Sequence, residues 1–248
     1  MKRLLFFLTA CVLLSGCGAS KSAGKQAQVV KPDKTCKVFL AGDSTCAPRR
    51  DKDRPKWGWG EKLAECLDGY EVVNRAMGGR SSKSFIDEGR WAKLIEMVNK
   101  GDVVLIQFGH NDEKQKAPER YTEPFGSFYD NLCRFITEVK AKEAVPVILT
   151  SLSRRQFKDG VLKRTHGDYP AAAKKAAADN GVVLLDIEEL SWQWITNLGD
   201  EASASRFFVS VDGSDNTHLV EQGAIEVAQM TAKALKECGD PYLAGLVK

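Results

Sequence analysis

The chain has 248 residues, of which 43% are hydrophobic and 28% are charged, and its formal net charge is +3. This hydrophobic content is enough for a sizeable buried core. The net charge is too small, and the basic residues are too dispersed along the chain, for a nucleic-acid-binding protein.

The N-terminus has the features of an export signal. Residues 1–3 carry positive charge, and residues 4–14 form an almost unbroken apolar run. A helix that spans a bilayer needs about 20 apolar residues, so this run is too short for one, but it suits a secretory signal. The run closes on Leu-Ser-Gly-Cys at 14–17, which resembles the lipobox of bacterial lipoproteins. We therefore expect residues 1–16 to be a lipoprotein signal peptide and Cys17 to carry a lipid.

An ordinary signal peptide with a chance cysteine near its end is the alternative. Residues 20–34 are rich in Lys, Ser, Ala and Gln and poor in large apolar residues, which is typical of a flexible tether. We expect residues 17–34 to link a membrane anchor, made of several acyl chains, to one domain at residues 35–248. The expected protein is a monomeric lipoprotein of the bacterial cell envelope, on its periplasmic or its cell-surface face.

The cysteines leave disulfide pairing open. Cys11 lies in the signal and Cys17 would be lipidated, so five remain: Cys36, Cys46, Cys66, Cys133 and Cys238. An odd number at irregular spacing does not determine which of them pair. The chain has no Cys-x-x-Cys pair and no dense cluster of Cys and His, so we expect no structural zinc site.

The domain alternates short apolar runs with longer amphipathic segments, the pattern of an α/β architecture. In chain order we expect a strand at 38–41, a helix at 61–67, a strand at 70–74, a helix at 91–99, a strand at 103–108, a helix at 125–142, a strand at 145–150, a helix at 169–180, a strand at 182–186 and a helix at 219–236. Apolar strands separated by helices predict a parallel sheet that is covered on both faces.

In such a sheet the ligand site lies at the carboxyl ends of the strands. Gly-Asp-Ser-Thr follows the first strand at 42–45, and Ala-Met-Gly-Gly-Arg-Ser follows the second at 76–81. Gly-His-Asn-Asp follows the third strand at 109–112, and Asp-Asn-Thr-His lies well beyond the fifth at 215–218. Small, polar and titratable residues therefore gather at one edge of the predicted sheet.

Ser44 is the candidate nucleophile, and a serine hydroxyl needs a neighbouring base to take its proton. His218 is the candidate base, because Asp215 lies three residues earlier and can hold the imidazole in the required tautomer. Asp212 is a second, less well matched acid, and His166 is the rival base. The alternative interpretation is a turn and helix cap at Ser44 and a loop histidine without a role.

Three groups are candidate donors to a developing oxyanion: the backbone N–H of Ser44, the backbone N–H of Gly79 and the side-chain amide of Asn111. A Gly-Gly pair lets the backbone approach a ligand closely. Loss of one such donor typically lowers the rate about 100- to 1000-fold. The alternative for Gly79 and Asn111 is an ordinary turn.

Together these motifs resemble the four conserved blocks of the SGNH (GDSL-type) hydrolases. More narrowly, Gly-Trp-Gly at 58–60, Asn-x-Ala-x-Gly-Gly-Arg-Ser at 74–81 and Phe-Gly-His-Asn-Asp at 108–112 look like the rhamnogalacturonan acetylesterases. The resemblance spans residues 38–234. It implies a flavodoxin-like, three-layer α/β/α sandwich around a five-stranded parallel sheet. It also implies a Ser44, Asp215 and His218 triad, and an oxyanion hole made by Ser44, Gly79 and Asn111.

The activity implied by the resemblance is that of a serine esterase that removes acetyl groups from rhamnogalacturonan through an acyl-enzyme, without cofactor or metal. Arg80, Trp57 and His110 are candidates for contacts with the polysaccharide. Lys83 stands where relatives often have an arginine, and lysine does not replace arginine in bidentate contacts. The alternatives are an acetylesterase for xylan or a cell-wall glycan, and a lipid-anchored carbohydrate-binding protein without activity.

Overall fold

The computed structural model describes residues 30–248. The predicted signal peptide, most of the tether and Cys17 lie outside the described residues. Within residues 30–248 no helix combines the length and the apolar character needed to cross a bilayer.

Five parallel strands form the central sheet, in the order β2-β1-β3-β4-β7. The bounds are Lys37–Gly42 for β1, Glu71–Asn74 for β2, Val103–Gln107 for β3, Val145–Leu149 for β4 and Val183–Leu185 for β7. The chain adds β2 on one side of β1 and all later strands on the other side. The strand order therefore reverses between β1 and β3, the position at which sheets of this kind bind ligands.

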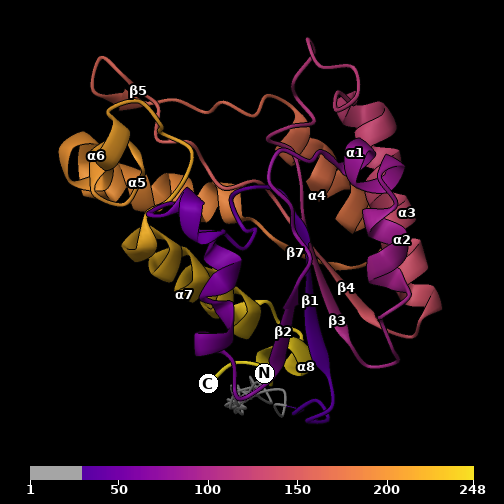
Figure 1. Ribbon diagram of the computed structural model, residues 1–248. Helices are drawn as coiled ribbons and strands as arrows, with labels where there is room; N and C mark the ends of the chain where they lie inside the picture. Colours follow the sequence, from indigo (N-terminus) through magenta and orange to yellow (C-terminus); the bar gives the residue numbers. More distant parts are fainter. Residues whose placement is uncertain (1–29) are drawn as a thin grey trace, which may run out of the picture.

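Helices cover both faces of the sheet (Figure 1). One face carries α1 (Ser82–Asp87), α2 (Arg90–Ile95), α3 (Tyr129–Ala141) and α4 (Tyr169–Asp179). The other face carries α5 (Ile187–Ala204), α7 (Glu221–Glu237), α8 (Pro241–Ala244) and two 3-10 turns, Trp59–Glu61 and Leu63–Cys66. This arrangement confirms the predicted three-layer α/β/α fold.

The side chains of β1 alternate between two hydrophobic cores, one on each face of the sheet. Val38 and Leu40 belong to the core on the side of α5 and α7, whereas Phe39 and Ala41 belong to the core on the side of α1 to α4. All four side chains are fully buried. Successive residues of a strand face opposite sides of the sheet, so a strand covered on both faces is apolar throughout.

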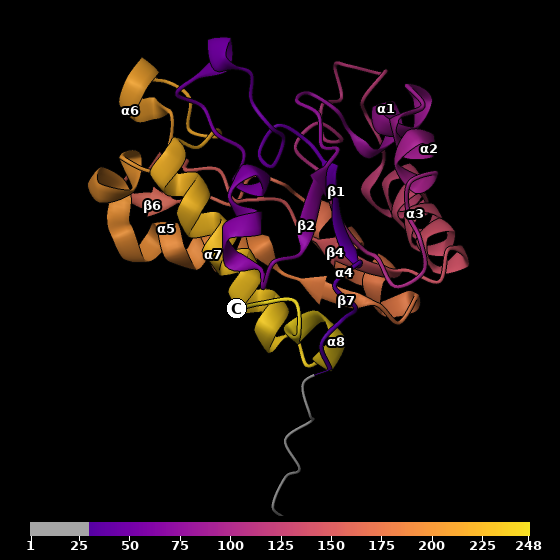
Figure 2. The ribbon, with the colours of Figure 1, turned by 60° about the horizontal axis from the view of Figure 1, so that its bottom comes forward.

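Further short elements surround the carboxyl ends of the strands. They are a 3-10 turn at Asp51–Asp53, a π-helical turn at Pro124–Phe128, helix α6 at Val209–Asp212, and an antiparallel hairpin of β5 (Phe157–Lys158) and β6 (Val161–Leu162). The opposite end of the sheet holds both ends of the described chain (Figure 2), where the Val30 N–H donates to the Pro241 carbonyl at 3.2 Å.

Two predicted helices differ from the structure. The segment predicted as a helix at 61–67 forms the two 3-10 turns instead, and the helix predicted at 91–99 ends at Ile95. The first turn packs closely on β1, since an added Cβ on Gly60 would lie 2.4 Å from Leu40 Cδ2 and 2.6 Å from the Cys46 carbonyl oxygen. The apolar stripe predicted for the helix at 125–142 is confirmed, since its five members are all buried: Phe128, Leu132, Phe135, Ile136 and Val139.

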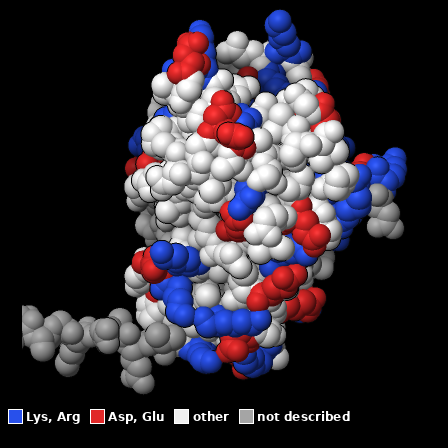
Figure 3. All heavy atoms as spheres, turned by 90° about the vertical axis from the view of Figure 1, so that its left-hand side faces the viewer, with Lys and Arg blue, Asp and Glu red and all other residues white. Residues whose placement is uncertain are grey.

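The five cysteines of the domain are all free in the structure of residues 30–248. The same part of the chain contains no group of three or more His, Cys, Asp and Glu side chains arranged to hold a metal ion. Basic and acidic side chains are interspersed on the face that carries α5, α6 and α7 (Figure 3), without a broad patch of one sign.

Candidate active site

Ser44 lies two residues beyond the end of β1, in a turn that Asp43 holds together. The Asp43 carboxylate accepts hydrogen bonds from the Thr45 N–H at 2.9 Å and from the Thr45 hydroxyl at 2.8 Å. The residue before Asp43 must be glycine, because a Cβ on Gly42 would lie 2.8 Å from the Gln107 carbonyl oxygen at the end of β3. This tight passage between two strand ends leaves Ser44 partly exposed at the edge of the sheet.

A chain of hydrogen bonds joins Ser44 to His218 and Asp215. The Ser44 Oγ lies 2.9 Å from His218 Nε2, and His218 Nδ1 lies 2.7 Å from Asp215 Oδ2. The Nδ1–H donates to the carboxylate, which leaves Nε2 free to accept the serine proton. The other Asp215 oxygen accepts from the backbone N–H groups of Thr217 and His218 at 3.1 and 3.0 Å. The acid and the base are therefore fixed to each other within one turn.

Two neighbouring segments hold the turn that carries His218. The Trp57 N–H donates to the Leu219 carbonyl at 2.9 Å, and the Phe208 N–H donates to the His218 carbonyl at 2.8 Å. The first of these contacts also brings Lys56 to the site, where its Nζ lies 2.8 Å from Asp215 Oδ2 and 4.3 Å from the centre of the Phe208 ring. Sequence reasoning did not find Lys56, because no motif links position 56 to position 215.

The protonation state of Asp215 follows from these contacts. Burial by itself raises the pKa of its carboxyl group, but the hydrogen bonds from His218 and Lys56 outweigh burial and hold the pKa well below its ordinary value. Asp215 is therefore ionised at any pH near neutrality. An ionised carboxylate at this position can stabilise the positive charge that the imidazole acquires when it takes a proton.

The two backbone N–H groups predicted as oxyanion donors form no hydrogen bond with the described part of the protein. Within residues 30–248, neither the Ser44 N–H nor the Gly79 N–H donates a hydrogen bond to a protein acceptor. Their loops are adjacent, since a Cβ on Gly78 would lie 3.6 Å from Ser44 Cβ. Gly79 has a φ of 79°, in the left-handed region that glycine adopts readily. Both donors are available to a ligand beside Ser44.

Asn111, the third predicted donor, has its amide orientation fixed on both sides. Its Oδ1 accepts from Lys114 Nζ at 2.8 Å, and its Nδ2 donates to the Arg80 carbonyl at 3.0 Å. The amide NH2 therefore lies toward the loop of Gly79 and Arg80. Burial is the main cause that lowers the pKa of Lys114, and the positive charges of Arg120 and Arg154 lower it further. Lys114 was not among the residues singled out from the sequence.

Asp112 fastens the loop that carries Asn111. Its two carboxylate oxygens accept four hydrogen bonds, from the Ser82 N–H and hydroxyl, the Thr122 hydroxyl and the Gly109 N–H. These bonds join the end of β3 to the start of α1. Burial raises the pKa of Asp112 to about 7. Asp112 is thus a structural residue of the site.

The rival base and the rival acid have other partners. His166 lies 3.0 Å from Glu188 Oε1 and 3.1 Å from His110 Nδ1, whereas the contact to Ser44 comes from His218. His110 is 4% exposed. Its burial is the main cause, and the neighbouring His166 the second cause, of a pKa well below the ordinary value, so His110 is neutral. Asp212 accepts from the N–H of Asp215 at 2.8 Å, which shapes the turn before the acid.

The residues predicted to contact sugar are engaged with the protein itself. The Trp57 ring is covered by the Arg54 guanidinium at 3.5 Å and approached by Lys62 Nζ at 4.3 Å. Arg80 Nε lies 3.0 Å from Glu88 Oε2. Lys83 Nζ donates to the Pro118 carbonyl at 2.7 Å, so it supports the loop after β3. In this conformation Trp57 fills the role of a packing residue.

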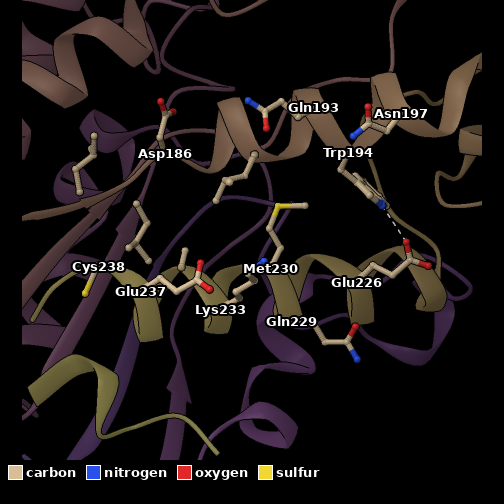
Figure 4. A pocket seen from close by; sticks show the side chains of 14 residues that line it. Asp186, Gln193, Trp194, Asn197, Glu226, Gln229, Met230, Lys233, Glu237 and Cys238 are labelled. Carbon is tan, nitrogen blue, oxygen red and sulfur yellow. Dashed lines mark hydrogen bonds between the residues drawn. The ribbon is translucent and has the colours of Figure 1, made fainter. Parts of the chain in front are cut away.

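A hollow of about 720 Å³ lies between α5 and α7 (Figure 4), away from these groups. Trp194 of α5 donates from Nε1 to Glu226 of α7 at 3.0 Å near one end, and Met230 of α7 lies in the gap between the helices. The hollow contains none of the residues predicted for the site. We locate the candidate active site at the strand ends, where a nucleophile, a base and free N–H donors meet.

Comparison with known proteins agrees with this location. The sequence profile of the GDSL-like Lipase/Acylhydrolase family matches residues 40–224, which include all the strand-end motifs described above. The chain belongs to this family. This GDSL-like protein is thus an enzyme, a carboxylic ester hydrolase.

Two proteins of Bacillus subtilis (strain 168) are similar to this GDSL-like hydrolase over most of their length. The "Probable rhamnogalacturonan acetylesterase YesY" is 37% identical over 85% of this chain and 97% of its own. The "Rhamnogalacturonan acetylesterase RhgT" is 38% identical over 86% of this chain and 95% of its own. Among solved structures, YxiM from Bacillus subtilis superimposes with a TM-score of 0.74 at 26% identity, over 83% of this chain and 57% of that protein.

Proposed function

We propose that this enzyme is a carbohydrate acetylesterase that removes acetyl groups from rhamnogalacturonan, with Ser44, His218 and Asp215 as its catalytic triad. The observation that carries the proposed chemistry is the 2.9 Å contact of Ser44 Oγ with His218 Nε2, backed by Asp215 at 2.7 Å from Nδ1. The proposed substrate is supported by two relatives of 37% and 38% identity that are named rhamnogalacturonan acetylesterases.

In the first half of the proposed reaction, Ser44 Oγ attacks the acetyl carbonyl carbon while His218 Nε2 takes the hydroxyl proton. The carbonyl oxygen becomes negatively charged and accepts hydrogen bonds from the N–H groups of Ser44 and Gly79 and from the Asn111 amide. Asp215, which is ionised, stabilises the imidazolium. The tetrahedral intermediate then collapses, the bond to the sugar oxygen breaks, and His218 donates its proton to that oxygen.

In the second half, a water molecule replaces the sugar and donates a hydrogen bond to His218 Nε2. His218 takes a proton from this water as it attacks the acetyl-Ser44 carbonyl, and the same N–H donors stabilise the second oxyanion. The ester bond to Ser44 breaks, and the proton returns from His218 to the serine oxygen. Acetic acid leaves and gives its remaining proton to the solvent, and the enzyme is restored without any net change in its protonation.

The test is acetate release from acetylated rhamnogalacturonan by the wild-type protein, Ser44→Ala and Ser210→Ala. We expect Ser44→Ala to lose at least about 1000-fold in kcat, and Ser210→Ala, a matched change at an exposed serine, to keep wild-type activity. Acetylated xylan is assayed in parallel. A higher kcat/KM on xylan would replace the proposed substrate, and acetate release by folded Ser44→Ala at the wild-type rate would refute the proposed nucleophile.

We also propose that the protein is a monomeric lipoprotein anchored through Cys17. The proposal is supported by the order of charge, apolar run and Leu-Ser-Gly-Cys at 14–17. Val30 enters the domain at the end of the sheet opposite Ser44 (Figure 2), so a tether there would point the active site away from the membrane. Palmitate labelling of the full chain expressed in a bacterium tests the anchor: Cys17→Ala should abolish the label, and label on that variant would refute the site.

A further inference from the structure

A second hollow, of about 490 Å³, opens beside the loop that carries the proposed acid and base. Asn216, which lies between Asp215 and His218 in the chain, lines it, and the β5–β6 hairpin forms a facing wall. The Arg155 N–H donates to the Asn216 carbonyl at 2.8 Å, which fastens the base of the hairpin to the loop. The hollow therefore belongs to the same edge of the sheet as Ser44. Its volume falls within the range of about 300–1,000 Å³ that small-ligand sites occupy.

The hairpin presents one face to the protein core and the other to the hollow. Leu162 is 5% exposed, and its strand partner Phe157 packs beside it against the core. Because side chains alternate along a strand, Lys158 and Lys163 lie on the opposite, outer face of the hairpin. The Lys163 N–H donates to the Gln156 carbonyl at 2.9 Å, so the ladder continues past β6 and fixes the position of Lys163. Both lysines line the hollow.

The positive charges of these two lysines are not neutralised by the protein. In the described part of the chain, neither Lys158 nor Lys163 forms an ion pair. The hollow contains one carboxylate, that of Asp200, which pairs with the Arg155 guanidinium. Arg155 is further saturated by Asn216 Oδ1 at 2.7 Å. The hollow therefore carries two uncompensated ammonium groups, those of Lys158 and Lys163.

We propose that this hollow binds a uronate residue of the polysaccharide, close to the sugar whose acetyl ester is cleaved. The lysine ammonium groups would pair with the carboxylate, and the Gln156 amide would bond to hydroxyl groups. This inference rests on the proposed function and specifies it further, because it requires the polymer to carry a carboxylate beside the reacting residue.

The kinetic test compares the double variant Lys158→Ala/Lys163→Ala with the wild type on three esters: acetylated rhamnogalacturonan, neutral acetylated xylan and 4-nitrophenyl acetate. One exposed ion pair changes a binding constant by about 1.5- to 5-fold. We therefore expect KM for the acidic polymer to rise about 3- to 20-fold in the double variant, with kcat unchanged. Both neutral esters should be hydrolysed as by the wild type. Sodium chloride should raise the wild-type KM for the acidic polymer and reduce the difference between the two proteins.

The matched control is Lys140→Ala/Lys142→Ala, which removes the same charge at the end of α3 on the other side of the sheet. It should leave KM for the acidic polymer within twofold of the wild-type value. An equal rise in both double variants would show that net charge acts at a distance and would overturn the site. An unchanged KM in Lys158→Ala/Lys163→Ala would overturn it as well.

A binding measurement separates this inference from the proposed chemistry. Trigalacturonate, which has no acetyl ester, is titrated into the wild type and the double variant by calorimetry, with a neutral trisaccharide as comparison. We expect the wild type to bind trigalacturonate more tightly than the double variant does, and the neutral sugar to show no such difference. Equal binding of trigalacturonate by both proteins would sink the uronate site, whatever the enzyme hydrolyses. Failure of the wild type to hydrolyse 4-nitrophenyl acetate would instead count against the proposed triad.

Discussion

Replacement of Lys56 with methionine should move the acidic limb of the pH profile of kcat/KM to higher pH. Lys56 Nζ and His218 Nδ1 both contact the same oxygen, Asp215 Oδ2. The ammonium group therefore lowers the pKa of Asp215 and opposes the arrival of a second positive charge on the imidazole. Without Lys56 the carboxylate acts on His218 alone, so a positive charge on the imidazole is stabilised more than in the wild type. A protonated His218 cannot accept the proton of Ser44.

The size of the shift follows from the geometry. The two contacts with Oδ2 measure 2.8 and 2.7 Å, so Nζ and Nδ1 lie at most about 5.5 Å apart. Two unit charges about 5 Å apart interact by about 3 kcal/mol at an effective dielectric constant of 20 and by about 0.8 kcal/mol in bulk water. The side chains of Lys56 and His218 are 27% and 24% exposed, which favours the lower part of this range. We expect about 1.4 kcal/mol, equivalent to about one pH unit.

The assay is hydrolysis of 4-nitrophenyl acetate from pH 4.5 to 9. In Lys56→Met the acidic limb should rise by about one unit, while kcat/KM on the alkaline plateau stays within about threefold. Lys56→Arg keeps the charge and should give a profile close to that of the wild type. Lys52→Met removes a charge from an exposed position of the same loop and should leave the limb in place. A limb that does not move in Lys56→Met, or moves to lower pH, refutes the electrostatic reasoning.

Three further changes test the supports of the site. Lys114→Met should lower kcat about tenfold, because a charged donor no longer fixes the Asn111 amide; Lys116→Met is the control, and equal activity in both variants would contradict this role. Asp112→Asn should lower the free energy of unfolding by about 1–3 kcal/mol in urea, because one carboxylate oxygen becomes an NH2 group that cannot accept from a buried donor such as the Gly109 N–H; unchanged stability would refute it. Gly42→Ala should cost about 1–3 kcal/mol by the same measurement, because its Cβ meets the end of β3, and a neutral effect would show that the strand ends can move apart.

The three central strands, β1, β3 and β4, were predictable because each is buried on both faces. An uninterrupted apolar run between polar segments has few alternatives in a chain of this length. The observed bounds of all five strands of the sheet lie within one residue of the predicted ones, as at 103–108 against Val103–Gln107 for β3. That the polar strand ends gather at one edge of the sheet followed from the parallel arrangement, whereas the order of the strands was not predicted.

Helix α5 (Ile187–Ala204), which is interrupted at Gly199, was not predicted, and its residues explain why. Ser191 and Thr196 are weak helix formers, and Gly199 takes a non-helical conformation with a φ of 78°. The helix is stabilised instead by an N-terminal cap at Asp186, whose side chain accepts from the Glu189 N–H, and by burial of residues such as Ile195. The cap is visible in the sequence, as Asp186 followed three residues later by Glu189, and was missed, whereas the burial depends on packing that a local pattern does not contain.

At the site, the sequence predicted which residues lie at the strand ends but not how charged groups pair there. Ser44, His218 and Asp215 follow from motifs, and the distances among them are those a triad requires; their catalytic roles stay predictions. Lys56 reaches Asp215 across the fold, and no spacing rule relates two such distant positions. Trp57 was predicted to contact sugar; Arg54 covers its ring in the structure, and the contact with the polysaccharide stays a prediction.

The proposed nucleophile and base stand 174 positions apart in the chain and nevertheless share a hydrogen bond. Ser44 follows the first strand of the domain, whereas His218 precedes α7. During synthesis the proposed nucleophile is therefore added to the chain long before the proposed base. Contacts of such long range form late and slowly. In the proposed mechanism an incomplete chain therefore lacks its base, and ester hydrolysis begins only once the turn that carries His218 has reached Ser44.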